Sequence, residues 1–390
     1  LKLSFQLSLF YQLCSRLKLT DKHAMVIWLS IFVVYFIFLI TLICGLNRWK
    51  KNLFSSTVTP PVTVVVAMRN EAHNLHMLIP SLAQQTYAGK WELILVDDHS
   101  EDTSVQVAQA LQHEYPQFTF TLIKSAGNGK KQALAAGINA ADGEIIVTTD
   151  ADCELPPDWL ADLVRSFKPT TQLVAGAVCL KNDATLFGNL QAVEFASVMA
   201  MGLGMLGWHK PVMCNGASLA FRKSAFDAVG GYTGNEHIAS GDDEFLMRKI
   251  SVQFPKSIRA IIYGNNSCKT IPPQSIGDFF EQRIRWASKW KANTSAFTKS
   301  LAVFVLLFQL LWLPMLGMAL FTLNPFLLAG VLWKLMLEGV LLAYASKLIQ
   351  QRFSFLAFIV LQVFYPFYVV GVALTSQCVG YKWKGRNTLL

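Results

Sequence analysis

The chain has 390 residues, of which 53% are hydrophobic and 15% are charged, and its mean hydropathy is +0.37. This composition is too apolar for an ordinary soluble protein of this length, so part of the chain is expected to lie in lipid. The formal net charge is +9, but no basic stripe with interleaved aromatic residues is visible, which argues against a nucleic-acid-binding protein.

Four apolar segments are long enough to form helices that cross a bilayer. Residues 26–46, 300–321 and 353–376 contain no charged residue, and each can span roughly 30 Å of hydrocarbon as a helix. The fourth segment, 325–346, carries a lysine and a glutamate one helical turn apart, so it either pairs them inside a bundle or is re-entrant. Residues 1–25 begin without Met and are interpreted as an N-terminal tail or an upstream extension of the native chain.

Basic residues beside these segments predict the side of the membrane. They follow the first segment and precede the second: Arg48, Lys50, Lys51, Lys289, Lys291 and Lys299. Because Lys and Arg are enriched in cytoplasmic loops, residues 47–299 are expected to face the cytoplasm, at the inner membrane if the source is a bacterium. The C-terminal tail 377–390 contains Lys382, Lys384 and Arg386, which fall on the opposite side if all four segments cross. This conflict indicates that one segment is re-entrant.

Strands alternate with helices between the first two membrane segments. The runs "VTVVVAM" (62–68), "WELILVD" (91–97) and "EIIVTTD" (144–150) are typical of buried strands, with helical patterns between them. This alternation predicts one α/β domain over 47–299, with a mostly parallel, Rossmann-like sheet. Ligands of such sheets bind beyond the carboxyl ends of the strands. Polar residues follow these ends: Arg69, Glu71, Asp98, Asp150 and Asp152.

Three of these carboxylates suggest a specific chemistry. Asp98 can accept hydrogen bonds from a nucleobase, although an aspartate there can equally help to open the next helix. Asp150 and Asp152 flank Ala151, so both point toward the same side of extended backbone. Two hard oxygen ligands suit Mg²⁺ or Mn²⁺, whose coordination is completed by water and substrate phosphates.

Later motifs have both a structural and a functional interpretation. Asp242 and Asp243 in "SGDDEFL" fall in the first turn of a predicted helix, where the helix dipole alone favours negative charge. Lys130 in "GNGKKQAL" belongs either to a helix N-terminus near a ligand or to a solvated lysine pair. The segment 189–211, rich in Met, Gly and Ala, is either a core helix or the lining of an acceptor groove.

Residues 275–293 are predicted to form a helix at the membrane surface, because aromatic residues occur along it directly before an apolar segment. Ser275 is expected to cap it, together with Asp278. Gln282, Arg285 and Trp286 of "EQRIRW" lie at i, i+3 and i+4 and therefore share one face.

These motifs, in this order, resemble those of the family 2 inverting nucleotide-sugar glycosyltransferases with the GT-A fold. The similarity is to their membrane-bound branch, which includes ceramide glucosyltransferase and the cellulose, chitin and hyaluronan synthases. It extends over about 62–291 and is carried by "AMRNEAHNL", "ILVDDHSEDTS", "GKKQALAAGI", "ADGEIIVTTDADC", "NGASLAFRKSAF", "SGDDEFL" and "QRIRW". The resemblance implies a GT-A domain with helices on both faces of its sheet, joined to transmembrane helices.

The resemblance also implies roles for the candidate residues. Binding of the nucleotide-sugar donor is implied for Arg69, Glu71, Asp98, Lys130 and Asp150. Asp152, with Asp150, is implied as the metal site. An alignment on Leu246 makes Asp243 the general base, whereas an alignment on Arg248 shifts that role to Asp242. Gln282 and Arg285 are implied to reach the diphosphate, and Trp286 to line the acceptor site.

The expected activity is metal-dependent, inverting transfer of a sugar, most simply from a UDP-sugar, to a lipid or glycan acceptor. Membrane lipids are expected as further partners of the chain. Three or four apolar segments are few for a polysaccharide channel, so a lipid or lipid-linked acceptor is favoured, with a processive polysaccharide synthase as the alternative. A third hypothesis is a catalytically inactive membrane scaffold that binds nucleotide sugars. Such a scaffold has no need of a general base or of Arg285.

Overall fold

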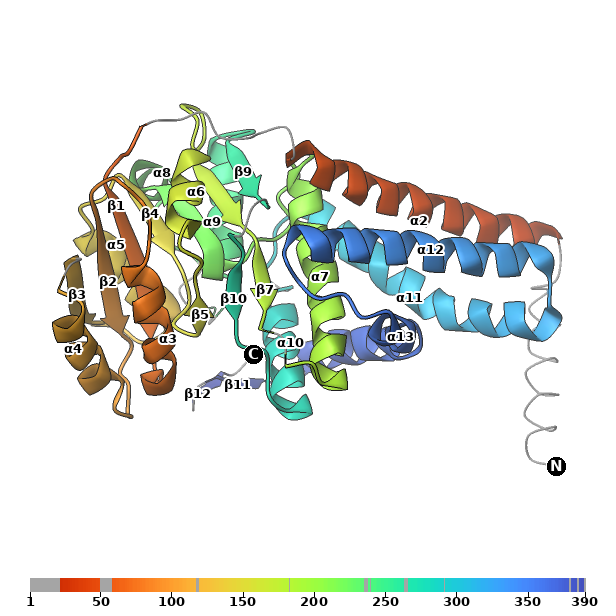
Figure 1. The fold of residues 1–390 in the computed structure, drawn as a ribbon. Coiled ribbons are helices and arrows are strands. Elements are labelled where there is room, and N and C mark those ends of the chain that lie inside the picture. Colours follow the sequence, from red (N-terminus) through yellow and green to blue (C-terminus); the bar gives the residue numbers. More distant parts are fainter. Residues whose placement is uncertain are drawn as a thin grey trace.

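The structure, a computed structural model, describes residues 22–49, 58–116, 119–181, 183–234, 238, 240–262, 266–290, 292–378, 380–383 and 386–388. Most of the predicted tail 1–25 and part of the tail 377–390 lie outside these residues, and so do four of the basic residues noted above: Lys50, Lys51, Lys291 and Lys384. An α/β domain occupies one end of the molecule, and long helices extend from it (Figure 1).

A seven-stranded sheet forms the centre of the α/β domain, in the order β3-β2-β1-β4-β8-β6-β9. Its strands are β1 (Val62–Met68), β2 (Trp91–Asp97), β3 (Thr119–Lys124), β4 (Ile145–Thr148), β6 (Leu173–Gly176), β8 (Leu219–Arg222) and β9 (Ile258–Ile261). Strands β1 to β4 are parallel, β8 runs antiparallel to both its neighbours, and β6 and β9 are parallel. The predicted mostly parallel sheet is confirmed.

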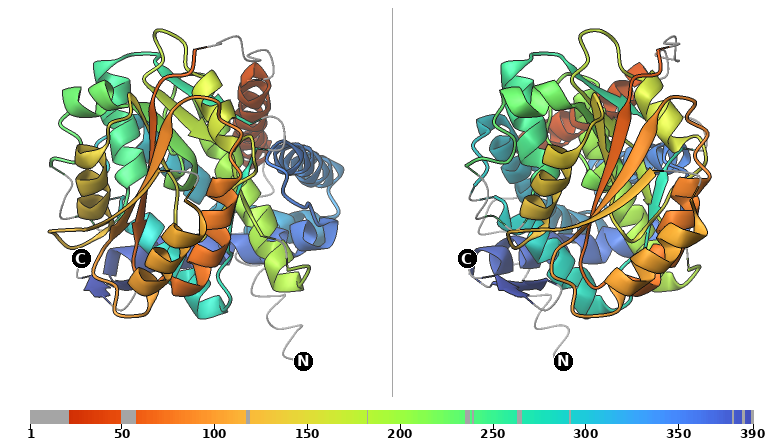
Figure 2. Two further views of the ribbon diagram at one scale, coloured as in Figure 1. Left: turned by 60° about the vertical axis from the view of Figure 1, so that its left-hand side comes forward. Right: turned by 90° about the vertical axis from the view of Figure 1, so that its left-hand side faces the viewer.

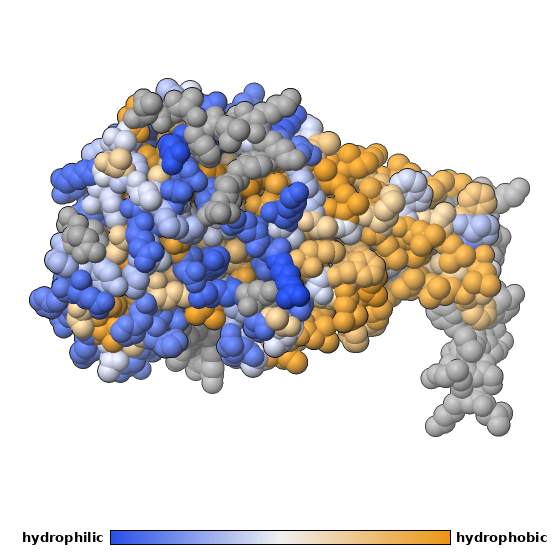
Figure 3. All heavy atoms as spheres, in the orientation of Figure 1, coloured by the Kyte–Doolittle hydropathy of each residue, from blue (hydrophilic) through white to orange (hydrophobic). Residues whose placement is uncertain are grey.

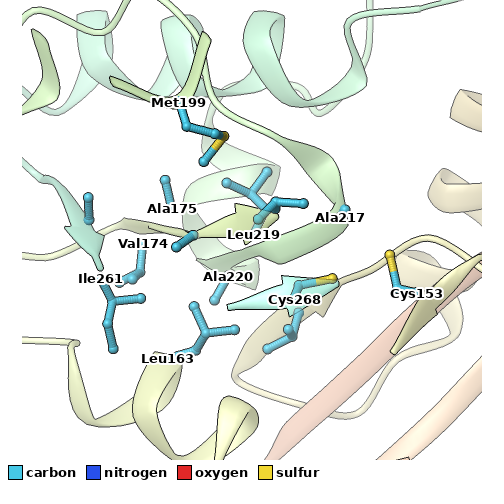
Figure 4. Packing of buried hydrophobic residues seen from close by; sticks show 14 of the residues in the cluster. Cys153, Leu163, Val174, Ala175, Met199, Ala217, Leu219, Ala220, Ile261 and Cys268 are labelled. Atoms are coloured by element: carbon cyan, nitrogen blue, oxygen red, sulfur yellow. The ribbon is translucent and has the colours of Figure 1, made fainter. Parts of the chain in front are cut away.

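Helices lie on both faces of this sheet (Figure 2). They are α3 (Ala72–Ala83), α4 (Ser104–Glu114), α5 (Lys130–Ala140), α6 (Trp159–Arg165), α8 (Lys223–Ala228) and α9 (Asp242–Gln253). Strand β1 is buried almost throughout, as expected for a strand covered on both faces. A second sheet of β5 (Cys153–Glu154), β10 (Cys268–Thr270) and β7 (Val178–Leu180) packs beside the first. Figure 4 shows Cys153 and Cys268 beside the core residues of β6 and β8.

Three helices run side by side away from the α/β domain: α2 (Lys22–Arg48), α11 (Ala296–Thr322) and α12 (Pro325–Leu348) (Figure 1). The visible surface of this region is mostly apolar, with a few polar residues among the apolar ones (Figure 3). Helices α7 (Leu186–Leu206) and α10 (Ile276–Ser288) lie at the junction, and α13 (Phe355–Cys378) passes beside them. By length and composition, the five described helices α2, α7, α11, α12 and α13 can each cross a membrane.

Helix α7 is held against α2 by close backbone contact. A Cβ atom added at Gly45 would lie 1.9 Å from the carbonyl oxygen of Gly204, and one added at Gly207 would lie 2.2 Å from that of Gly45. Only glycine fits at such a crossing, as is common between helices in lipid. The indole of Trp49 also donates to the carbonyl of Leu203, at 3.0 Å. The first membrane helix therefore fixes the position of α7.

The charged residues of the fourth apolar segment pair inside the helix bundle, one of the two arrangements predicted. Lys334 lies 2.9 Å from Glu338, and Gln362 of α13 donates to Glu338 at 3.1 Å. Lys334 is 2% exposed. The pair is thus shielded from lipid by neighbouring helices.

The chain on both sides of α13 lies next to the α/β domain. Before it, Gln351 accepts a hydrogen bond from the backbone N–H of Leu180 in β7, at 2.6 Å. Along it, Tyr368 donates to Glu194 of α7 at 3.1 Å. After it, the hairpin of β11 (Tyr381–Trp383) and β12 (Arg386–Thr388) begins with a strand that contacts α10. Helix α13 therefore returns toward the domain.

Candidate active site

A cavity of about 250 Å³ lies between the carboxyl ends of the central strands and the junction helices α7 and α10. All eleven residues that the sequence nominated line this single cavity: Arg69, Glu71, Asp98, Lys130, Asp150, Asp152, Asp242, Asp243, Gln282, Arg285 and Trp286. Residues more than 200 positions apart in the chain therefore meet in one place. Their individual roles remain predictions.

Asp98 follows β2 and is 1% exposed. Its Oδ1 accepts the backbone N–H of Gly129, which precedes α5, at 2.8 Å. Its neighbours make the turn contacts that lead into α4 instead: Asp97 accepts the N–H of Ser100 at 3.0 Å, and Asp102 accepts that of Ser104 at 2.9 Å. Asp98 thus ties two loops together at the cavity wall, rather than opening helix α4.

Arg69 lines the cavity, but its guanidinium also holds the loop that carries Asp98. It donates to the carbonyl oxygens of Asp98 (3.0 Å) and His99, and it pairs with Glu101 at 2.7 Å. Glu71 accepts a hydrogen bond from Asn74 at 2.6 Å. Through these contacts Arg69 holds the loop 98–101 that forms part of the cavity wall.

Asp150 and Asp152 follow β4 and are both half-buried, whereas Ala151 between them is buried, as expected for alternating extended backbone. Among the residues that the structure describes, no cluster of three or more His, Cys, Asp or Glu could hold a metal ion. Two carboxylates at an open cavity suit a hard cation that takes its other ligands from water and substrate phosphates. The residues present therefore fit Mg²⁺ or Mn²⁺ in that mode.

Lys130 connects the two acidic motifs. Its Nζ lies 2.6 Å from Asp150 and 3.2 Å from Asp242. Burial alone would lower the pKa of Lys130, but the charges of these two carboxylates raise it well above its ordinary value. The interpretation as a solvated lysine pair is wrong, because Lys130 is half-buried between these carboxylates and Lys131 is buried, with its Nζ 5.0 Å from the ring centre of Phe245.

Asp242 and Asp243 begin α9 but have different surroundings. Burial acts to raise the pKa of Asp242, yet the charge of Lys130 lowers it below the ordinary value. Asp243 accepts the backbone N–H of Gly216 at 2.9 Å, and burial raises the pKa of this carboxyl although Lys289 opposes the effect. These opposite directions favour Asp243 over Asp242 as the predicted general base.

This difference predicts the pH dependence of the reaction. If Asp243 is the base, the rate falls as the pH is lowered through its pKa, which lies above the ordinary value near 3.8. Replacing Lys289 by Met removes a positive charge that lowers this pKa, so the acidic limb of the pH–rate profile is expected to move to higher pH. The measurement is the rate of sugar transfer from an active donor against pH. Lys249→Met, on α9 but bonded to the loop carbonyls of Gly231 and Thr233, is the control and should leave the limb in place.

Helix α10 carries the residues of "QRIRW". Ser275 accepts the N–H of Asp278 at 3.1 Å, which confirms the predicted cap. The helix ends at Ser288, five residues before the predicted end at 293, because the chain turns at Lys289 and Trp290 before Ser295 caps α11. Gln282, Arg285 and Trp286 nevertheless share the face toward the cavity, as expected from their spacing.

The neighbouring Arg283 was not singled out from the sequence. It is 4% exposed and pairs with Glu194 of α7 through two nitrogens, at 3.0 and 2.5 Å. Its guanidinium also lies 4.3 Å from the ring centre of Trp286. Glu194 is the one acidic residue of helix α7 as the structure describes it, and an isolated charge in such a segment is a signal that could have found the pair.

Lys289 and Glu244 are further cavity residues that the sequence did not assign. They lie 3.2 Å apart and connect α9 to the end of α10. Burial alone would lower the pKa of Lys289, but Glu244 and Asp243 raise it. The charge of Lys289 therefore persists beside the candidate base.

Known proteins resemble this chain in both sequence and fold. The profile of glycosyl transferase family 21 matches residues 26–389. A poly-beta-1,6-N-acetyl-D-glucosamine synthase of Staphylococcus epidermidis is 24% identical over 265 residues, which cover 64% of this chain and 60% of that protein. The Staphylococcus aureus (strain COL) protein of the same name is 25% identical over 262 residues, covering 65% of this chain and 60% of that protein. The chain thus matches well under two thirds of the length of these relatives.

A solved structure has a similar fold over nearly the whole chain. It is that of a mannosyltransferase from Pyrobaculum calidifontis in complex with GDP-Man and Mn²⁺. The TM-score is 0.56 at 21% sequence identity, and the match covers 91% of this chain and 97% of that one. At this identity the likeness establishes the fold, which is that of a GT-A domain with membrane helices.

Proposed function

The chain belongs to glycosyl transferase family 21 and is a membrane glycosyltransferase, and from this premise we propose that it transfers a sugar from a nucleoside-diphosphate donor to a hydroxyl group of a lipid or lipid-linked acceptor, with inversion at the anomeric carbon. The observation that carries the proposal is the single cavity lined by all eleven candidate residues. This cavity also adjoins the apolar helices, through α7.

Donor binding is proposed at the strand ends. Asp98 and the loop that Arg69 holds would receive the nucleobase, and a UDP-sugar is the simplest candidate donor. The half-buried Asp150 and Asp152 would hold Mg²⁺ or Mn²⁺; when bound, this cation stabilises the negative charge of the leaving diphosphate. The mannosyltransferase of similar fold is in complex with GDP-Man and Mn²⁺, which supports a nucleotide-sugar donor and a divalent cation by analogy.

Asp243 is proposed as the general base. It would take the proton from the acceptor hydroxyl as the oxygen attacks the anomeric carbon from the face opposite the nucleoside diphosphate. Because one carboxylate serves the acceptor and no covalent sugar–enzyme intermediate is required, the configuration should invert. Arg285 and Gln282 of α10 would stabilise the departing diphosphate through charge and hydrogen bonds.

Two acceptor classes compete. The apolar helices beside the cavity favour a lipid acceptor, which meets the donor at the membrane surface. A processive polysaccharide synthase is the second candidate, since the relatives reported above are named poly-beta-1,6-N-acetyl-D-glucosamine synthases. Full-length protein in lipid vesicles, given a panel of radiolabelled UDP- and GDP-sugars, separates them. We expect label in a product of one or a few sugars that extracts into organic solvent, whereas label in a long water-soluble polymer would favour the synthase.

We further propose that α2, α11 and α12 cross the membrane and that α13, predicted as the segment 353–376, does not. The chain before and after α13 contacts the α/β domain, so the C-terminus should lie on the domain's side. Lys382, Lys384 and Arg386 would then be cytoplasmic, in accord with the positive-inside tendency.

The test of this topology uses two epitope tags, one fused to the C-terminus and one inserted after the exposed Thr170 of the α/β domain. In sealed vesicles of one orientation, both tags should react with antibody on the same side. Reaction on opposite sides would mean that α13 crosses the bilayer.

A further inference from the structure

A second cavity, of about 220 Å³, lies within the helix bundle. Residues of α2, α7, α11, α12 and α13 line it, most of them aliphatic or aromatic. On α2 the lining extends from Leu42 to Tyr35, about 10 Å along the helix axis at 1.5 Å per residue. The cavity therefore follows the apolar helices for about two turns away from the α/β domain.

Helix α7 and the segment at Met213 form the wall between the two cavities over part of their length. Val198 of α7 and Met213 line both of them. Phe195 and Met199 line the candidate active site, whereas Ser197 and Met201 line the second cavity. A molecule held in the bundle cavity thus lies directly behind the wall of the site where sugar transfer is proposed.

Most polar side chains of the bundle cavity have partners within the protein, and Gln309 is a further polar group in its lining. Glu194 pairs with Arg283, and Ser197 donates to the backbone carbonyl of Glu194 at 2.6 Å. Glu338 accepts hydrogen bonds from Tyr35 and Gln362 and pairs with Lys334, and Lys334 also donates to Gln362. Lys334 lies 3.9 Å from the ring centre of Trp312 as well. Because the charged groups are already paired, they do not require a polar ligand, and apart from Ser197 and Gln309 the remaining contacts that the cavity offers are apolar. Such a lining suits hydrocarbon and offers little to the hydroxyl groups of a polysaccharide.

We propose that the bundle cavity holds the hydrocarbon tail of the acceptor, and that the acceptor's hydroxyl group reaches Asp243 past the shared wall at Val198 and Met213. The ligand class is an amphiphile with an acyl or isoprenoid chain and a single head that carries the hydroxyl. This inference rests on the proposed function, to which it adds the place where the acceptor is held. It gives the family's membrane helices a binding role beyond anchoring.

The test is photo-crosslinking with the full-length protein in phosphatidylcholine vesicles. The probe is a diacylglycerol that carries a diazirine in the middle of one acyl chain, and mass spectrometry locates the labelled residues. We expect label on the cavity side of α12 and α13. Leu361→Trp fills the cavity and excludes the acyl chain, so the cavity label should fall about tenfold, which corresponds to about 1.4 kcal/mol of binding free energy.

Leu356→Trp is the matched control, since Leu356 lies on the same helix but is 64% exposed and does not line the cavity. It should leave the cavity label unchanged, and Leu342→Trp provides a second cavity-filling variant if Leu361→Trp does not fold. Label spread evenly over the outer helix surfaces, and equal in all variants, would overturn the tail site.

Release of nucleoside diphosphate from the donor panel is measured in the same samples. Release without cavity label would leave sugar transfer standing and remove the tail site. Cavity label without release from any donor would support a lipid site and overturn the transfer reaction. The two proposals can therefore fail separately.

Discussion

Replacing Asp243 by Asn is expected to lower the rate of sugar transfer by about 10²–10⁴-fold, the usual contribution of a positioned general base. The amide oxygen of Asn can still accept the N–H of Gly216, which Asp243 accepts at 2.9 Å, so the local structure should persist. An amide cannot take the proton from the acceptor, and the loss should therefore fall on the rate rather than on donor binding. Labelled transfer product and equilibrium binding of the donor measure the two effects.

Asp242→Asn distinguishes the alternative base. Asp242 pairs with Lys130 and has a lowered pKa, so its replacement should disturb donor binding more and the chemical step less. Asp227→Asn, at an exposed position of α8, is the control and should behave like the wild type. A larger loss of rate in Asp242→Asn than in Asp243→Asn would move the base to Asp242, as the alignment on Arg248 allows.

Replacing Glu194 by Gln is expected to destabilise the protein by about 3–5 kcal/mol, because it leaves the guanidinium of Arg283 buried without its counter-charge. Both side chains are 4% exposed, and the pair joins α7 to α10. The apparent melting temperature of the purified protein, at one heating rate in one detergent, measures the loss. Glu144→Gln is the control, because Glu144 pairs with Arg222 at the surface and is 54% exposed.

A double variant tests whether the charge itself is responsible. Glu194→Leu with Arg283→Met removes both charges, so it should recover much of the stability that either single replacement loses. Gln282, Arg285 and Trp286 lie beside Arg283 on α10, and we expect the double variant to bind donor more weakly than the wild type even when it is stable. Wild-type stability in Glu194→Gln would show that the pair does not anchor α10.

Much of the fold is predictable from the sequence because its elements are strongly patterned. The apolar runs predict buried strands at β1, β2 and β4. The long uncharged segments predict membrane helices at α2 and α11. Helix α7 could not be placed in the same way. Its apolar residues face a sheet on one side and membrane helices on the other, and composition does not distinguish the two.

The site is predictable to the extent that strand ends position it. Asp98, Asp150 and Asp152 follow parallel strands, and the topology of such a sheet brings these ends to one edge. The ion pairs could not be predicted, because their partners come from distant segments: Lys130 with Asp242, Lys289 with Glu244, and Arg283 with Glu194. The return of α13 to the domain likewise depends on hydrogen bonds between segments that are far apart in the chain.

The most direct test of the central claim is release of nucleoside diphosphate by the purified full-length protein in lipid vesicles. A panel of UDP- and GDP-sugars is supplied with Mg²⁺ or Mn²⁺ and a lipid extract as acceptor. The wild type should release nucleoside diphosphate from at least one donor, and Asp243→Asn and Asp152→Asn should release little above background. Equal release by the wild type and Asp243→Asn, or none from any donor by the wild type, would contradict the account.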